Sequence, residues 1–200
     1  MPETASSRSL TLTGVLTVIL GAIGLLAAFA LTLEKIHLLE VPGSVPSCDF
    51  SLLVQCGANL NSAQGSIFGF PNPVIGLMAW PVVITIGVAL IGGVRFPRWF
   101  WLGFNAGVAL ALCFVIWLIG TSIFALATLC PWCMVTWAVT IPLFWIVTLE
   151  NLRSGRIPAG AAVRRLADSA YGWIPLITLL CYLIVAVIAQ LRLDVLGQFF

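Results

Sequence analysis

The residues best suited to chemistry in this chain are the two cysteines of Cys130-Pro131-Trp132-Cys133. Two cysteines separated by two residues can close a small disulfide ring. Pro131 is placed to open a helix, whose positive N-terminal end favours a thiolate. The pattern is typical of redox centres. A structural disulfide and half of a zinc site remain as alternatives, although zinc needs four ligands and His37 is the only histidine.

A second cysteine pair, Cys48 and Cys56, lies in the most polar part of the chain, residues 34–70. Prolines and glycines interrupt this segment, so we expect a loop long enough to carry function. Apolar side chains around the two cysteines indicate a lid lying on the membrane surface. Cys113 and Cys181 fall within apolar stretches, where we expect them to be inert packing residues.

Composition indicates that these cysteines belong to a membrane protein. Of the 200 residues, 61% are hydrophobic and 8% are charged, whereas a soluble domain carries about 25% charged residues. The chain is therefore predicted to be an all-α integral membrane protein. Its net charge of +2 gives no indication of a nucleic-acid partner.

Five uncharged apolar segments, each about as long as the roughly 20 residues needed to cross a bilayer, predict five spans. They are residues 10–33, 73–94, 99 to about 120, 131–149 and 173–191. We expect residues 1–150 to form a four-helix transmembrane core with an outer loop, 34–71, that carries the first cysteine pair. Residues 151–170 are predicted to be a basic cytoplasmic loop, and residues 171–200 a fifth transmembrane helix and tail. A cleavable signal peptide is an alternative for the first span, although the apolar run is longer than such a peptide requires.

Small residues predict close helix packing at two places. In the first span they recur at every seventh position, at Gly14, Gly21 and Ala28. In the third span they recur at every fourth position, at Gly103, Gly107 and Ala111. Asn105 in the third span is a candidate for a hydrogen bond between helices.

The distribution of basic residues predicts the orientation of the chain in the membrane. With a cytoplasmic N-terminus, seven basic residues fall inside: Arg8, Arg95, Arg98, Arg153, Arg156, Arg164 and Arg165. Only Lys35 and Arg192 then lie outside, which follows the positive-inside rule. Both cysteine pairs come to the same outer face, where disulfides form.

Two dithiols on the oxidising side of a membrane can form a relay by thiol–disulfide exchange. A relay needs a terminal electron acceptor. The sequence contains no dinucleotide fingerprint, haem attachment motif or metal cluster. We therefore infer a small apolar acceptor that arrives through the lipid, a requirement that a quinone satisfies, and we expect menaquinone rather than ubiquinone.

The chain resembles vitamin K epoxide reductase and its bacterial homologues, in particular the five-span actinobacterial form that acts like DsbB. The resemblance covers residues 12–149 and is carried by Cys48-Asp49, Cys56, Ser62, Ser66-Ile67-Phe68-Gly69 and Cys130-Pro131-Trp132-Cys133. It implies a four-helix bundle around a quinone pocket. It also implies that Cys133 faces the quinone, that Cys130 exchanges with Cys56, and that Cys48 meets a thioredoxin-like partner.

Candidate quinone contacts follow from the same resemblance, with two departures from it. Ser62, Phe68 and Trp137 are the candidates. Ser62 is a possible hydrogen-bond donor or an ordinary loop cap, and Trp137 either stacks on the quinone or fills the bundle. Gly65 stands where vertebrate members have an asparagine thought to bond the quinone carbonyl. Trp137 stands where they have a tyrosine involved in anticoagulant binding, so warfarin-like sensitivity does not carry over.

We therefore expect a quinone-dependent disulfide oxidant in a bacterial inner membrane, with its N-terminus cytoplasmic and its C-terminus outside. Some bacterial relatives carry a fused thioredoxin-like domain, whereas this chain ends after the fifth span, so the expected partner is a separate DsbA-like protein. Two alternatives are an outward carrier of reducing equivalents, like CcdA, and a non-enzymatic adaptor with structural disulfides. The first requires cysteines reachable from the cytoplasm.

Overall fold

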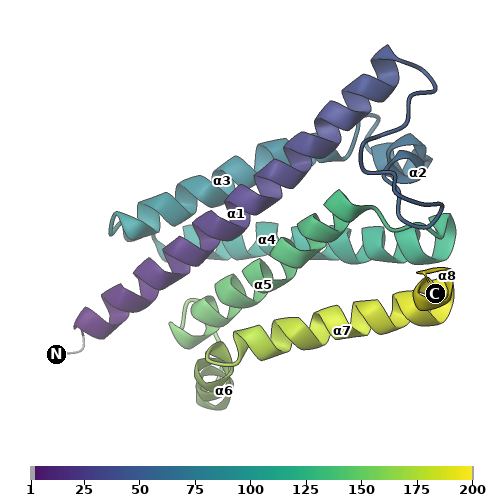
Figure 1. Cartoon of the computed structure of the whole chain (residues 1–200). Helices are drawn as coiled ribbons and strands as arrows, with labels where there is room; N and C mark the ends of the chain where they lie inside the picture. Colours follow the sequence, from purple (N-terminus) through teal and green to yellow (C-terminus); the bar gives the residue numbers. More distant parts are fainter. Residues whose placement is uncertain (1–2, 200) are drawn as a thin grey trace.

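Five long helices build the structure, a computed structural model that describes residues 3–199 (Figure 1). They are α1 (Glu3–Glu40), α3 (Pro73–Ile91), α4 (Arg98–Gly120), α5 (Pro131–Arg153) and α7 (Ile174–Leu193). Five shorter helical elements are α2 (Gly57–Asn61), η1 (Ala63–Ser66), η2 (Thr121–Leu126), α6 (Ala161–Tyr171) and α8 (Val195–Phe199). All five long helices are long and apolar enough to cross a membrane. The prediction of an all-α membrane protein is confirmed.

Proline residues start the helices on which the site depends. Pro73 and Pro131 occupy the first turns of α3 and α5, where a missing N–H costs nothing and the fixed φ suits a helix. Pro97 precedes α4 in an extended conformation. The starts of these helices therefore follow directly from the sequence.

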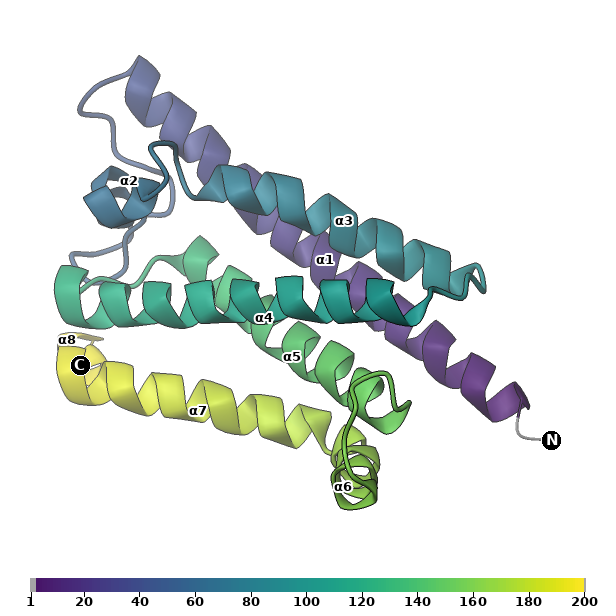
Figure 2. The same cartoon turned by 180° about the vertical axis from the view of Figure 1, so that it is seen from behind.

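Helices α1 and α3 lie against each other along much of their length (Figures 1 and 2). Glycines permit this close packing: a Cβ added to Gly14 would lie 2.8 Å from Gly87 O, and one added to Gly76 would lie 2.7 Å from the Ala28 side chain. Gly21 packs in the same way against Ile84. The predicted small-residue face of the first span is confirmed.

The small residues of α4 have a different role from the one expected. A Cβ added to Gly103 or Gly107 would meet no atom within 4 Å, so the predicted close-packing face is wrong. Gly107 and Ala111 instead line a cavity, because their missing side-chain atoms leave space inside the bundle. The prediction for Asn105 is confirmed, since its Oδ1 accepts a hydrogen bond from Asn151 Nδ2 of α5 at 3.2 Å.

The outer loop is shorter than predicted because α1 continues to Glu40. No helix breaker occurs between residue 34 and Pro42, so the helix has no reason to stop at the polar residues. Those residues hold the loop instead. Lys35 Nζ donates to Leu60 O at 2.8 Å, and the Glu34 carboxylate accepts from Ser47 N at 3.2 Å.

Two connections also differ from expectation. The third span continues beyond Gly120 as the π-helix η2, which ends at Ala127 with a left-handed backbone (φ 52°). The basic connection after α5 contains the helix α6, which packs on α5 through Ala167. Helix α7 is anchored to α5 by Tyr182, whose hydroxyl donates to Ala138 O.

Candidate functional site

Cys130 is the N-cap of α5, and its sulfur accepts a hydrogen bond from Cys133 N at 3.4 Å. Pro131 forces the helix to begin at this point, so the first cysteine stands at the positive end of the helix dipole. The pKa of the Cys130 thiol is lowered from its ordinary value, chiefly by a hydrogen bond from the Cys133 side chain, although burial opposes this shift. The first motif cysteine is thus prepared to act as a thiolate.

Cys48 and Cys56 form a disulfide with a Cα–Cα distance of 5.7 Å. Asp49 holds this bond in place, because its Oδ1 accepts hydrogen bonds from Cys56 N at 2.6 Å and Gly57 N at 3.0 Å. The carboxylate thereby satisfies free N–H groups at the start of α2. Cys48 is 3% exposed and Cys56 is fully buried, so this loop pair is covered by its own loop.

The two cysteine pairs meet through Cys56 and Cys130, whose sulfurs lie 3.3 Å apart. A two-residue bridge between Val54 and Leu129 sets this approach. In it, Gln55 N donates to Leu129 O at 3.1 Å, and Leu129 N donates to Leu53 O at 2.7 Å. The backbones immediately before Cys56 and Cys130 are therefore bonded to each other, which fixes the distance between the two sulfurs.

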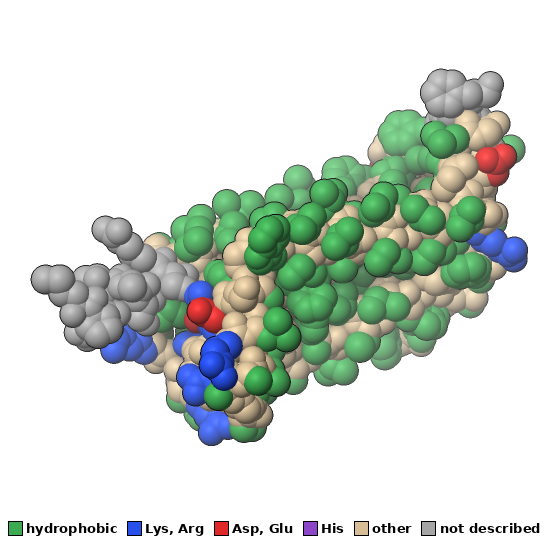
Figure 3. Space-filling model, turned by 90° about the horizontal axis from the view of Figure 1, so that it is seen from below, with side chains coloured by type: hydrophobic (Ala, Val, Ile, Leu, Met, Phe, Trp, Pro, Cys, Tyr) green, Lys and Arg blue, Asp and Glu red, His purple; other side chains and the backbone are tan. Residues whose placement is uncertain are grey.

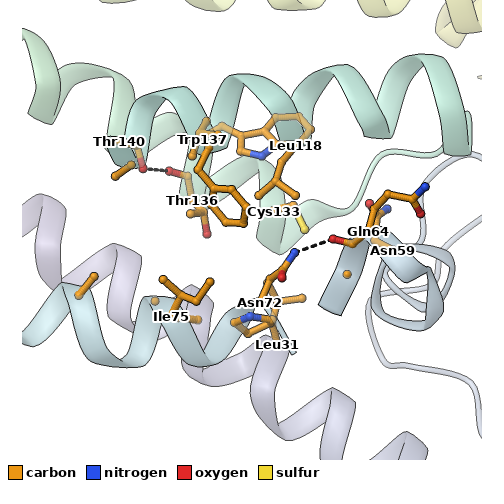
Figure 4. Close-up of a pocket in the computed structure, with 18 of the residues that line it drawn as sticks. Leu31, Asn59, Gln64, Asn72, Ile75, Leu118, Cys133, Thr136, Trp137 and Thr140 are labelled. Carbon is orange, nitrogen blue, oxygen red and sulfur yellow. Dashed lines mark hydrogen bonds between the residues drawn. The ribbon is translucent and has the colours of Figure 1, made fainter. Parts of the chain in front are cut away.

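A cavity of about 660 Å³ lies beside Cys133, bounded by α1, α3, α4, α5 and the outer loop. This volume falls within the range of small-molecule sites. Figure 4 shows Cys133, Trp137 and Asn72 around the same space. Cys133 lines the cavity, whereas Cys130 does not. The two motif cysteines thus have different neighbours: Cys130 faces the loop pair, and Cys133 faces the cavity.

All three candidate quinone contacts, Ser62, Phe68 and Trp137, line this cavity. The Ser62 hydroxyl donates to Asn59 O at 2.8 Å and accepts from Gly65 N at 3.0 Å, so its proton is engaged in capping η1. Trp137 Nε1 is buried without a hydrogen-bond partner among the described residues. Because buried donors are normally paired, this N–H is the group most in need of an acceptor at the site.

Asn72 is a cavity residue whose role the sequence did not reveal. It directly precedes Pro73 at the start of α3, but its side chain makes no capping bond. Instead, its Nδ2 donates to Gln64 O at 2.7 Å (Figure 4), and its Oδ1 accepts from Ile67 N at 3.3 Å. Asn72 therefore closes the turn that presents Phe68. The sequence gives no sign of this role, because the Asn72 side chain bonds to backbone groups eight and five residues away and such bonds produce no periodic pattern.

Residues 15–148 match the profile of the vitamin K epoxide reductase family, and no curated protein matches the chain. The matched segment contains both cysteine pairs, the bridge between Val54 and Leu129, and the helices that bound the cavity. It ends before α6 and α7. Because the match covers most of the chain and all of the elements that build this site, the chain belongs to the vitamin K epoxide reductase family, whose members are membrane oxidoreductases linked to quinones.

Proposed function

We propose that this protein is a quinone-dependent thiol–disulfide oxidoreductase that makes disulfides and transfers them to a DsbA-like protein. The 3.3 Å distance between Cys56 Sγ and Cys130 Sγ is the observation that carries the proposal. It lies within reach of thiol–disulfide exchange between the two pairs. The setting we propose is a bacterial inner membrane, with the N-terminus cytoplasmic and the cysteine pairs outside. The positive-inside rule supports this orientation.

The first exchange oxidises the partner. A thiolate of the reduced DsbA-like protein attacks Cys48, and the sulfur of Cys56 leaves as a thiolate. The partner's second thiol then attacks the mixed disulfide and releases Cys48 as a thiol. The partner departs with a disulfide, and the loop pair is left as a dithiol.

The second exchange restores the loop pair. The Cys56 thiolate attacks Cys130 of the motif disulfide, and Cys133 leaves as a thiolate. Cys48 then attacks Cys56, which re-forms the Cys48–Cys56 bond and frees Cys130. The arrangement described above, with the loop pair joined and both motif sulfurs free, corresponds to the end of this step.

The cavity fits a quinone by volume, by its largely apolar lining and by the unpaired Trp137 N–H. A bound quinone would accept two electrons and two protons from Cys130 and Cys133 and leave as the quinol, while the motif disulfide closes again. We propose that the Trp137 N–H, which lacks a partner among the described residues, donates a hydrogen bond to a quinone carbonyl. Gly65 has no side chain for this task. Phe68 adds apolar cover together with two neighbouring rings. Its ring centroid lies 6.2 Å from that of Phe70 and 6.3 Å from that of Phe114. We propose menaquinone rather than ubiquinone as the acceptor.

The decisive experiment mixes purified protein, a reduced DsbA-like partner and a menaquinone or ubiquinone analogue, and follows quinone absorbance. Cys133→Ala should abolish quinone reduction and accumulate a Cys56–Cys130 disulfide, whereas Cys113→Ala, a change on the exposed surface of α4, should behave like the wild type. Reduction of an oxidised outer partner by a reduced thioredoxin on the cytoplasmic side, without quinone reduction, would support the CcdA-like alternative. Inertness towards both would support an adaptor.

The role of Trp137 has its own test. Trp137→Phe removes the N–H and keeps an aromatic ring, so the KM for quinone should rise about two- to tenfold, as expected for one lost hydrogen bond. The rate of exchange with the partner should stay unchanged. An unaltered KM would assign Trp137 to packing alone.

A further inference from the structure

Basic side chains gather at one end of the molecule, the end that carries α6 (Figure 3). The arginines of the loops and helix ends there are Arg95, Arg98, Arg153, Arg156, Arg164 and Arg165. Among the side chains that the structure describes, the acids at this end are Glu150 and Asp168. The end therefore carries an excess of positive charge. Four of the six arginines lie beyond the segment that matches the family.

Several of these arginines have structural roles. Arg153 pairs with the buried Glu150 at 2.6 Å and stacks over the Tyr171 ring at 3.7 Å. Arg156 lies over the Trp101 ring at 4.3 Å, and Arg98 Nε donates to Arg156 O at 2.7 Å. These contacts join α4, α5 and the connection after α5. They leave Arg164 and Arg165 of α6 exposed, with no hydrogen bond or ion pair of their side chains to any part of the described chain.

Helix α6 runs across the direction of the long helices, since both Figure 1 and Figure 2 present it nearly end-on beside the lengthwise α5 and α7. It is fixed in this position by Ala167, which is buried against α5, and by Tyr171, whose hydroxyl lies 2.8 Å from Thr13 Oγ1 of α1. A helix that lies across the end of a transmembrane bundle is parallel to the membrane surface.

The two flanks of α6 differ in chemistry. At 100° per residue, Val163 and Leu166 lie on the flank opposite Arg164 and Arg165. Leu166 is 69% exposed, and Trp173, just after the helix, is 60% exposed. Apolar side chains on one flank and arginines on the other are the pattern of a helix seated between acyl chains and headgroups. Exposed tryptophan is also typical of that interface.

We propose that Arg164 and Arg165 bind the headgroups of anionic phospholipids in the leaflet around α6. The occupant follows from charge and position, because two unpaired guanidinium groups stand at headgroup depth beside apolar side chains directed to the acyl region. Guanidinium binds phosphate oxygens by paired hydrogen bonds. Asp168 on the polar flank is the only acid within α6 and offsets part of the charge. This surface is independent of the proposed redox function.

The test counts lipids on the delipidated protein in neutral detergent by native mass spectrometry, with equal amounts of phosphatidylglycerol and phosphatidylcholine. The wild type should retain phosphatidylglycerol preferentially. In the double variant Arg164→Gln, Arg165→Gln this preference should fall by at least roughly fivefold, the effect expected for one basic residue near an anionic surface. The lysine double variant, which keeps the charge, should restore most of it.

Arg192→Gln is the matched control, because Arg192 lies near the end of α7 remote from α6 and stacks on Phe124. It should keep the wild-type preference. Quinone reduction in detergent should be unchanged in all variants, which verifies folding. Retention of the preference in the glutamine double variant would overturn the proposal, as would an equal loss in Arg192→Gln. Displacement of the bound lipid by millimolar inorganic phosphate would overturn it too, by indicating a site for free anions.

Discussion

Cys130 is the residue through which the two cysteine pairs meet, since its sulfur lies 3.3 Å from Cys56 Sγ and accepts a hydrogen bond from Cys133 N. Cys130 faces the loop pair and Cys133 faces the cavity. In the function proposed above, Cys130 therefore exchanges with the loop pair and Cys133 contacts the acceptor. The type and spacing of the four cysteines made this division predictable from the resemblance, whereas the unpaired Trp137 N–H emerged only from the packing of α4 and α5.

The lowered pKa of Cys130 predicts a pH dependence. A lowered pKa keeps the thiolate present at pH values where an ordinary thiol is protonated, and reactivity is lost only as the pH falls through the lowered pKa. Cys133→Ala removes the main cause of the shift, so the pH profile of Cys130 alkylation should move to higher pH. We would measure it by peptide mass spectrometry on reduced protein in a Cys48→Ser, Cys56→Ser background. A profile that stays in place or moves to lower pH would contradict this account.

At the scale of elements, helix ends decide whether the sulfurs meet. Ala127 ends η2 in the left-handed region, and Thr128 N then donates to Ser122 O at 3.1 Å, which turns the chain towards the bridge at Leu129. A left-handed alanine costs about 1–2 kcal/mol relative to the right-handed form. That cost is tolerated because the turn places Cys130.

Ala127→Gly should therefore raise the free energy of unfolding by up to about 1 kcal/mol, since glycine adopts this conformation without strain but loses more entropy on folding. Ala127→Val should lower it and slow exchange between the cysteine pairs. Chemical denaturation in detergent, followed by circular dichroism, measures both. Equal stability of the glycine and valine variants would exclude backbone strain at this turn.

Some elements could be predicted from the sequence and others could not. The starts of α3 and α5 were predicted correctly, because a proline followed by a long uncharged apolar segment is a local signal. The bridge between Val54 and Leu129 was missed, since a pairing of two short segments 75 residues apart has no periodicity. Helix α6 was predicted to be a loop, because its 11 residues are polar on one side of the helix and a glycine stands directly before and after them.

At the scale of the whole molecule, the redox pairs and α6 lie at opposite ends of the bundle (Figure 1). The C-terminal end of α7 belongs to the redox end, where Ala189 and Leu193 pack against Leu53 and Leu129. Helix α7 lies outside the family match, yet it supports the bridge that aligns the sulfurs.

In the function proposed above, the partner must open the outer loop before it can react, because Cys48 is 3% exposed. In Cys56→Ala, Cys48 is a free thiol that can attack a disulfide. A DsbA-like partner that lacks its second cysteine and carries its first as a mixed disulfide with a small thiol should therefore release that thiol and accumulate as an adduct through Cys48. The adduct should be visible on a non-reducing gel and disappear with dithiothreitol. An adduct through Cys130, with Cys48 left free, would mean that the loop pair is a structural clasp.

The complete burial of Cys130 has a consequence for the cell. Small dissolved thiols such as glutathione have no path to the sulfur that connects the two pairs, since the loop disulfide covers it on one side and the bundle on the other. In the function proposed above, the quinone pool is thereby insulated from the thiols of the surrounding fluid. Electrons then enter only when a protein large enough to displace the loop arrives, so the flux responds to unfinished protein oxidation rather than to the ambient redox poise.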